Sequence, residues 1–260
     1  MRFKLVLSVH PEAHGNVLPI SYQYELTSCF NRLLMQDNKR YVDWLELNGL
    51  TPSDNIQTRV YAISNLYIPR IMVKGDRLTI KAPRVQCWLS FMPKQGTEEF
   101  VQQCFENKVV VIGDRISRVL LSIDQVSMLS EIELTETMDY TSLSPITVVS
   151  LNPRFGNRIE FLDPDNPFFS QFLFEELVER YERIKKKPYE GLRDFHFELL
   201  FPPKRKSIYV RRFSHKEQCI ISYIMKFRLK MSLELQRFAY ETGLGDKVNL
   251  GFGYIELLHK

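Results

Sequence analysis

The chain has 260 residues and a net charge of +4, and 44% of its residues are hydrophobic while 25% are charged. This composition is typical of a globular protein with one large or two smaller domains. Residues 2–9 alternate like a strand where a signal peptide would have an apolar block, and no run approaches the roughly 18 apolar residues of a membrane-spanning helix. We therefore expect a cytoplasmic protein without a membrane partner.

The first part of the chain shows a strand pattern followed by helix patterns. A period of two predicts a strand over residues 2–9, and a loop that contains His10 and His14 comes next. Apolar residues spaced by three and four predict a helix over residues 22–36 and a second, short helix over residues 41–49.

Strands and one further helix complete the first half. Strands are predicted at residues 58–66, 77–82, 109–112 and 117–128. The helix carries Phe100 to Phe105, with Thr97 as its expected N-cap. The order is βα, ββ, αβ, which describes a ferredoxin-like unit.

The second half repeats this order of elements. Its predicted strands are at residues 140–151, 195–201, 207–213, 218–229 and 254–258, where 207–213 and 218–229 form a hairpin. One helix starts at Pro167 and runs to the lysines before Pro188, and another spans residues 233–242. The sequence thus predicts an α+β fold of two tandem ferredoxin-like (βαββαβ) domains, at residues 1–133 and 134–260. The two halves share no residue-level repeat.

The four cysteines are scattered, and none forms a Cys-x-x-Cys pair. They are Cys29, Cys87, Cys104 and Cys219. Their apolar surroundings predict buried, reduced thiols rather than a zinc site or a disulfide framework. The sequence accordingly predicts no metal and no other cofactor.

Positive charge is concentrated between Lys204 and Lys230. Nine Lys and Arg residues stand there against the single acid Glu217, a local excess of nine minus one, or +8. Tyr209, Phe213 and Tyr223 lie between the charges. Cations interleaved with aromatic residues are typical of a nucleic-acid surface, although a solvated basic face remains an alternative.

The end of the chain carries the motif Gly243-Leu-Gly245, a five-residue spacer, and Gly251-Phe-Gly253, followed at once by a strand. Glycine permits positive φ, so successive backbone N–H groups can form a concave anion site. No Gly-Lys-Ser/Thr is present for a P-loop, and the motif leads into a strand rather than a helix. We expect a phosphate clamp of another kind, and we expect Gly251→Val to weaken it while leaving the fold largely intact. The alternative is that the glycines only connect the last helix to the last strand.

This terminal motif resembles the C-terminal signature of the CRISPR-associated repeat-processing endoribonucleases of the RAMP superfamily. The resemblance extends along the chain through the strand after Met1, the segment after Leu18, the segment Tyr41 to Gly49 and the strand after Leu143. It implies two ferredoxin-like domains, CRISPR repeat RNA or precursor crRNA as the partner, and a role in antiviral defence. It also implies metal-free cleavage, in which the 2′-hydroxyl attacks the adjacent phosphate and leaves a 2′,3′-cyclic phosphate.

The chain departs from the family at the usual catalytic residues. Many relatives have a histidine at the position of Glu46, some have a tyrosine near Asn31, and some have a lysine just after Gly49, where this chain has Leu50-Thr51-Pro52. Catalysis needs an acid, a base and cations for the phosphorane. The candidate catalytic residues are Glu46, His10, His14 and Tyr22. His215, in the turn of the basic hairpin, is a further residue that can contact RNA.

The residues expected to bind RNA come from three places. They lie after the first helix, in the basic hairpin and in the glycine motif: Lys39, Arg40, Lys204, Arg205, Lys206, Arg211, Arg212, Gly245, Lys247, Gly251 and Gly253. Three functions stay open: a repeat-processing endoribonuclease, a family member that only binds or delivers guide RNA to an effector complex, and a domain pair that binds another anion or a protein. The sequence leaves open a monomer or a homodimer.

Overall fold

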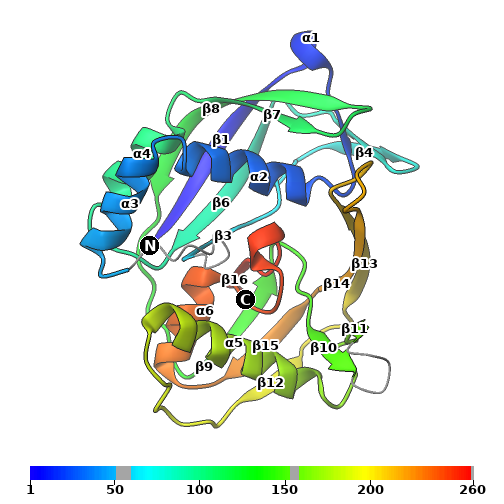
Figure 1. Cartoon of the computed structure of the whole chain (residues 1–260). Helices are drawn as coiled ribbons and strands as arrows, with labels where there is room; N and C mark the ends of the chain where they lie inside the picture. The colour runs from blue at the N-terminus through cyan, green and yellow to red at the C-terminus, as the bar shows by residue number, and fades with distance from the viewer. Residues whose placement is uncertain (51–59, 153–157, 259–260) are drawn as a thin grey trace. The chain divides into compact units, whose positions relative to one another are not determined.

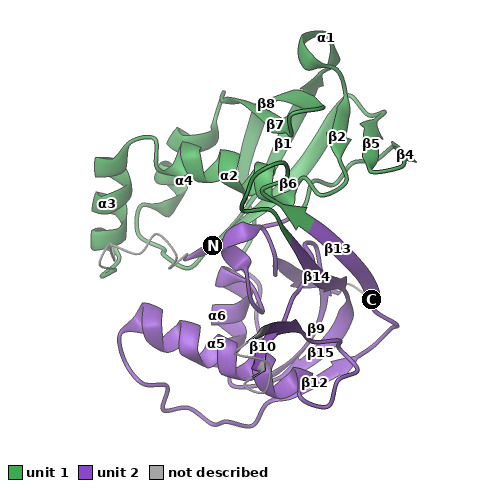
Figure 2. Cartoon of the chain, turned by 45° about the vertical axis from the view of Figure 1, so that its right-hand side comes forward, with its two compact units in different colours: residues 1–54, 65–131, 209–218 green, residues 55–64, 132–208, 219–260 purple. Residues whose placement is uncertain are grey.

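The computed structural model describes residues 1–50, 60–152 and 158–258 (Figure 1). Contacts divide the chain into two compact units, and neither is continuous in sequence (Figure 2). Unit 1 comprises residues 1–54, 65–131 and 209–218, and unit 2 comprises residues 55–64, 132–208 and 219–260. The division of the chain between residues 133 and 134 stays a prediction.

Unit 1 is built on an antiparallel sheet in which strands run in the order β6-β1-β8-β7. These strands are β1 (Arg2–His10), β6 (Arg84–Phe91), β7 (Val109–Gly113) and β8 (Arg118–Met128). β1 lies between β6 and β8 and is antiparallel to both. The predicted period of two is confirmed, because Phe3, Leu5 and Leu7 are each at most 1% exposed.

Three helices complete the ferredoxin-like part of unit 1: α2 (Gln23–Leu34), α3 (Asn38–Leu47) and α4 (Thr97–Phe105). α2 and α4 contact each other and the sheet, as Figure 1 shows. α2 buries Leu26, Phe30 and Leu34 on one face. Trp44 of α3 stacks on Phe100 of α4 with ring centroids 4.4 Å apart. The helix predictions for residues 22–36, 41–49 and 100–105 are confirmed.

One strand of unit 1 was assigned wrongly from the sequence. The segment predicted at 77–82 is β5 (Arg77–Ile80), which belongs to a separate three-stranded sheet with β2 (Val17–Pro19) and β4 (Ile71–Lys74). The strand of the main sheet is β6, which the sequence reading missed. The sequence does contain a strand pattern there, since Val85, Cys87 and Leu89 are apolar at every second position. All three are fully buried in the structure. The predicted strand at 58–66 begins outside the described residues, and β3 (Tyr61–Ile63) occupies its middle.

Two local predictions in unit 1 also need correction. The loop expected at His10 and His14 contains one turn of helix, α1 (Pro11–His14). Thr97 does not cap α4: its Oγ1 donates to the Pro93 carbonyl at 2.9 Å and accepts the Trp44 Nε1–H at 3.0 Å. Gly96, at φ 66°, is the N-cap residue. Thr97 thus serves the buried aromatic cluster rather than the helix end.

Unit 2 has a four-stranded sheet in the order β12-β15-β9-β16. Its elements are β9 (Thr137–Ser142), α5 (Phe169–Lys185), β12 (His196–Leu199), β15 (Lys226–Lys230), α6 (Leu233–Thr242) and β16 (Ile255–Leu257). Taken in sequence, these are βαββαβ with the strand order 2-3-1-4, as a ferredoxin-like domain requires. The fold is therefore two tandem ferredoxin-like domains, as predicted.

Two hairpins are inserted into this second pattern. They are β10–β11 (Val149–Asn152 and Arg158–Phe161) and β13–β14 (Lys204–Val210 and Gln218–Ile224). The strand predicted at 140–151 is consequently two strands, and the one predicted at 218–229 ends at Ile224. The chain changes sheet at Met225, whose backbone N–H and C=O both bond to Ser142.

The cysteine prediction holds for Cys29, Cys87 and Cys104, which are buried thiols outside any disulfide, but Cys219 is exposed. Cys219 is the second residue of β14, and the strand is exposed at its first two positions and buried from Ile220, so the apolar residues that follow do not predict burial of Cys219. Among the described residues, no helix is both long and apolar enough to cross a membrane.

Candidate nucleic-acid interface

A depression of about 830 Å³ lies on unit 1, where α2, the β7–β8 turn and residues 211–216 of the hairpin tip meet. Its lining is dominated by cations: Arg32, Arg115, Arg118, Arg211, Arg212 and Lys216. Glu25, Asp114 and His215 also line it. We call this surface the arginine depression. Such a set of guanidinium and ammonium groups suits phosphate oxygens.

Arg212 anchors the hairpin tip in unit 1 through two carboxylates. Its Nη1 lies 3.0 Å from Asp76 Oδ2 and 3.9 Å from Asp114 Oδ2. The hydrogen bond from Arg212 is the main cause that lowers the pKa of Asp76 below its usual value. Arg77 lies 2.7 Å from the same Asp114 oxygen. Arg212 is therefore partly neutralised, and it positions the hairpin tip.

Asp114 shapes the β7–β8 turn that presents Arg115 and Arg118. Burial tends to raise the pKa of Asp114, but hydrogen bonds from the Ser117 and Ile116 N–H groups and from Arg77 hold it below its usual value. The carboxylate therefore stays ionised at neutral pH. Gly113 is required at this turn, because a Cβ atom there would lie 2.2 Å from the Ser117 carbonyl oxygen.

The hairpin tip holds two residues in the left-handed backbone region, Arg211 at φ 55° and Phe213 at φ 62°. The turn is held by Phe213 N–H, which donates to Glu217 Oε2 at 2.8 Å, and by Ser214 Oγ, which donates to the Arg211 carbonyl at 2.7 Å. Left-handed conformations of non-glycine residues cost free energy and are frequent at functional sites. This turn directs Arg211 over the ring of Tyr24, 5.7 Å from its centroid.

Glu25 is the residue of this surface that the sequence reading missed. It lies in the first turn of α2 and lines the arginine depression, yet its Oε2 atom is buried without a hydrogen-bond partner. Burial raises the pKa of Glu25 to about 7, and the charge of Asp114 adds to this while Arg212 opposes it. In the sequence Glu25 is one residue on the polar face of an amphipathic helix. Its burial cannot be predicted from the sequence, because the groups that cover it lie far along the chain.

The other predicted basic residues of the hairpin, Lys204, Arg205 and Lys206, are exposed on β13. They belong to unit 2, whereas Arg211 and Arg212 belong to unit 1. The sequence run of positive charge is thus divided between the two units.

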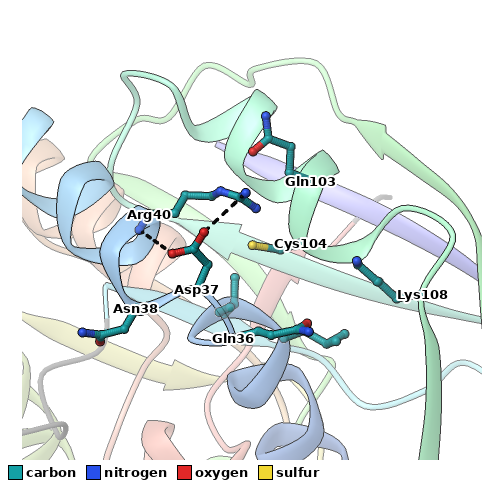
Figure 3. Close-up of a pocket in the computed structure, with 9 residues that line it drawn as sticks. Gln36, Asp37, Asn38, Arg40, Gln103, Cys104 and Lys108 are labelled. Atoms are coloured by element: carbon teal, nitrogen blue, oxygen red, sulfur yellow. Dashed lines mark hydrogen bonds and ion pairs between the residues drawn. The ribbon is translucent and has the colours of Figure 1, made fainter.

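Arg40 borders a second depression, of about 460 Å³, formed by the ends of α2 and α3 and by α4 (Figure 3). Its guanidinium lies 3.5 Å from Asp37, which also caps α3 by accepting the Arg40 N–H at 3.1 Å. Figure 3 shows these two side chains pointing toward each other, with Lys108 farther along the rim. Lys39 is exposed on the first turn of α3. Arg40 is thus less available to a phosphate than the exposed arginines of the arginine depression.

The glycine motif is packed into unit 2 rather than open to solvent. Leu244 and Phe252, the large residues within its two glycine pairs, are fully buried. The Leu244 N–H donates to the Gly253 carbonyl and the Gly253 N–H to the Pro145 carbonyl, each at 2.9 Å. The Gly251 N–H donates to the Val248 carbonyl at 3.1 Å. The predicted anion nest is therefore wrong for these amides, because protein carbonyls already accept them.

The motif nevertheless needs its glycines. A Cβ atom on Gly245 would lie 2.6 Å from the Thr147 carbonyl oxygen. Gly251 has φ 93°, so the expectation that Gly251→Val leaves the fold intact is wrong, because a branched side chain strains this conformation. Lys247, also left-handed at φ 60°, is partly exposed. A role of these residues toward RNA stays a prediction.

The predicted catalytic residues are not gathered in one place. The Tyr22 hydroxyl is buried, accepts the Leu66 N–H at 3.0 Å and donates to the Leu66 carbonyl at 3.4 Å, so it belongs to the core. Burial raises the pKa of Tyr22 above its usual value. His10 lies between Glu12, 3.1 Å from Nδ1, and Ser122, 2.9 Å from Nε2. His14 is exposed at the end of α1, and Glu46 is exposed on α3. Figures 1 and 2 show α1 and α3 at different ends of unit 1.

Comparison with known proteins finds similarity to one group of proteins. The family model described as CRISPR associated protein Cas6, C-terminal, matches residues 129–257. An endoribonuclease-like Cas6 protein of Pyrococcus furiosus is 26% identical over 99% of this chain and 99% of its own length. This chain is therefore similar to Cas6 proteins over its whole length. As the sequence predicted, it is a relative of the CRISPR-associated repeat-processing endoribonucleases of the RAMP superfamily.

Further Cas6 relatives match over nearly the whole chain. A CRISPR-associated endoribonuclease Cas6 of Methanocaldococcus jannaschii is 24% identical over 98% of this chain and 92% of its own. The solved structure of a Cas6-related protein from Pyrococcus furiosus has a TM-score of 0.80 at 24% identity, over 100% of this chain and 99% of that one. A structure described as an RAMP protein binding different RNA substrates has a TM-score of 0.77 at 23% identity, over 100% of both chains. These structures share the fold.

Proposed function

We propose that this chain binds CRISPR repeat RNA and cleaves precursor crRNA by metal-independent attack of a 2′-hydroxyl. The observation that carries the proposal is the arginine depression, since six cations around one cavity of about 830 Å³ match a phosphate backbone. The full-length likeness to proteins named as Cas6 endoribonucleases supports the choice of substrate. Because such transcripts are made in the cytoplasm of prokaryotes, we expect the protein to act there.

In this reaction the protein has to position the RNA, balance the charge of the phosphorane and transfer protons. The 2′-hydroxyl attacks the neighbouring phosphorus, the bond to the 5′-oxygen breaks, and the product ends are a 2′,3′-cyclic phosphate and a 5′-hydroxyl. Arginines balance the charge of the phosphorane, and a proton donor and acceptor speed the reaction. Tyr24, which already faces Arg211, offers a surface on which a base can stack.

A second function is favoured by one observation. The four catalytic candidates are a core tyrosine, a histidine already bonded to two side chains, and two exposed residues on separate elements. A chain with this arrangement that binds RNA through its arginines would hold or deliver guide RNA to an effector complex without cutting it. Whether it acts as a monomer or a homodimer, its RNA surface would be the same.

The test is incubation of the purified protein with repeat RNA from the CRISPR arrays of its own genome, with EDTA and protein in excess. Product ends that carry a cyclic phosphate would support the endoribonuclease. Tight binding with intact RNA would support the carrier. A second arm replaces Lys204, Arg205, Arg211 and Arg212 together by Gln. Unchanged affinity and an unchanged salt dependence of that affinity would overturn both functions.

A further inference from the structure

Glu25 combines two properties that a solvated carboxylate lacks. Its side chain lines the arginine depression, while its Oε2 atom is buried with no hydrogen-bond partner among the described residues. Burial raises its pKa to about 7, so a substantial fraction of Glu25 is protonated at neutral pH. The depression therefore holds a proton beside the groups that would bind phosphate.

Bound phosphate would raise the pKa of Glu25 further. A second negative charge nearby raises a carboxyl pKa further, so RNA in the depression favours protonated Glu25. A carboxylate repels phosphate oxygens, but a protonated carboxyl donates a hydrogen bond to them. Protonated Glu25 would then act as a hydrogen-bond donor and an acid beside the phosphate, and it would not repel the RNA.

His215 lines the same depression from the hairpin tip. It is exposed and lies two residues before Glu217, which holds the turn through the Phe213 N–H. Histidine is the side chain that most often exchanges protons near neutral pH. The tip thus places an imidazole and the first turn of α2 places a carboxyl on one cationic surface.

We propose that Glu25 and His215 are the acid and the base of RNA cleavage, an assignment that rests on the proposed function. His215 accepts the proton of the 2′-hydroxyl as its oxygen bonds to phosphorus. The bond from phosphorus to the 5′-oxygen breaks, and Glu25 gives its proton to that oxygen. Water then carries a proton from His215 back to Glu25, so that no metal or other reactant is consumed.

The charged groups that face this pair come from every element around the depression. α2 supplies Arg32, the β7–β8 turn supplies Asp114, Arg115 and Arg118, and the hairpin tip supplies Arg211, Arg212 and Lys216. Of these, Asp114 raises the pKa of Glu25 and Arg212 lowers it. Cleavage requires His215 without its proton and Glu25 with one. The cleavage rate should therefore pass through a maximum as pH rises, and the fall on the alkaline side should depend on Glu25.

The decisive experiment separates the two roles by changing the leaving atom. Single-turnover cleavage in EDTA is measured on repeat RNA and on the same RNA with sulfur in place of the 5′-oxygen at the cleaved bond. Sulfur leaves without a proton, so it does not need an acid. Glu25→Gln should slow cleavage of ordinary RNA by about 100-fold or more and restore nearly the parental rate on sulfur RNA. His215→Ala should slow both by a similar factor.

Two matched variants serve as controls. Glu98 lies in the first turn of α4 as Glu25 does in α2, and it is exposed, so Glu98→Gln removes a first-turn charge away from the depression. His196→Ala removes an exposed histidine at the start of β12. Both should cut at the parental rate. All variants should bind ordinary RNA within about threefold of the parent, since the arginines remain.

Four outcomes would overturn the assignment. One is a Glu25→Gln variant that cuts ordinary RNA at the parental rate, and another is one that is equally slow on sulfur RNA. In both cases the proposed endoribonuclease would stand with other catalysts. If the parent binds repeat RNA and leaves both substrates intact, the assignment and the cleavage activity fail together while RNA binding stands. Loss of RNA binding in the parent would sink the proposed function as a whole.

Discussion

The glycine motif and the tip of the basic hairpin are the two regions that the sequence singled out for binding anions, and they differ in what they offer to a ligand. In the glycine motif the N–H groups of Leu244, Gly251 and Gly253 donate to protein carbonyls. At the hairpin tip, Arg211 and Lys216 are exposed around a depression, and only Arg212 is held by carboxylates.

This difference shows that a motif can require glycine for internal packing. Positive φ and close approach explain Gly245 and Gly253 by internal packing alone. Long cationic side chains behave otherwise, because they have more donors than a turn can satisfy. We therefore expect the first contacts with RNA at the hairpin tip.

The largest effect is expected at Gly253, where φ is +81° and a Cβ atom would lie 2.3 Å from the Leu244 carbonyl oxygen. Gly253→Ala should lower the free energy of unfolding by about 3 kcal/mol or more, because backbone must move. Gly49→Ala is the matched control, since φ is +68° and nothing lies within 4 Å of the added atom. It should cost about 1 kcal/mol, measured by urea unfolding. Equal losses would mean that the glycine motif adapts easily.

Glu25→Gln should stabilise the protein at high pH. The pKa of Glu25 is about 7 in the folded chain against 4.5 as its ordinary value, so the folded state binds more protons between these pH values. The free energy of unfolding then falls as pH rises through this window. Gln cannot titrate, so it removes this dependence on pH. The free energy of unfolding of the variant should exceed that of the parent by on the order of 2 kcal/mol at pH 8 and should equal it at pH 4. A difference independent of pH would contradict the burial of this carboxyl.

Arg115→Gln combined with Lys216→Gln should weaken RNA binding about tenfold and reduce the slope of log affinity against log salt by about one to two. Both side chains are exposed in the arginine depression. The control is Lys185→Gln with Lys187→Gln, an exposed pair at the end of α5 in unit 2. Fluorescence anisotropy across a salt series distinguishes them. Equal weakening in both pairs would make the binding a matter of net charge.

The smallest effect is expected inside the glycine motif, at Asp246. Its Oδ2 accepts the Val149 N–H at 2.8 Å, and burial raises its pKa to about 6, helped by the charge of Glu176. Asp246→Asn keeps an acceptor and should be more stable than Asp246→Ala by about 1 kcal/mol. It should also lose the fall in unfolding free energy that the parent shows as pH rises toward 6. Identical stability of the two variants would mean that the Val149 bond contributes nothing.

Local patterns predicted most of the elements because their causes are local. The alternation in β1, the amphipathic spacing of α2 and the glycine after α6 each lie within a few residues. The predictions failed where a residue distant in sequence determines the local structure. Residues 77–80 alternate as well as β6 does, but only pairing partners decide which strand joins the main sheet. Thr97 resembles an N-cap until Trp44 is found against it.

The candidate site divides in the same way. The sequence by itself determined that the chain is a pair of ferredoxin-like domains, that cations gather near its basic hairpin, and that four glycines shape its end. Only the tertiary structure decided that the amides of Gly243, Gly251 and Gly253 are occupied, that Arg115 and Arg118 join Arg211 and Arg212, and that the Oε2 atom of Glu25 is buried beside them. The physical reason is that burial and charge act through space, and the residues that change the pKa of Glu25 are about 90 to 190 positions away in the chain.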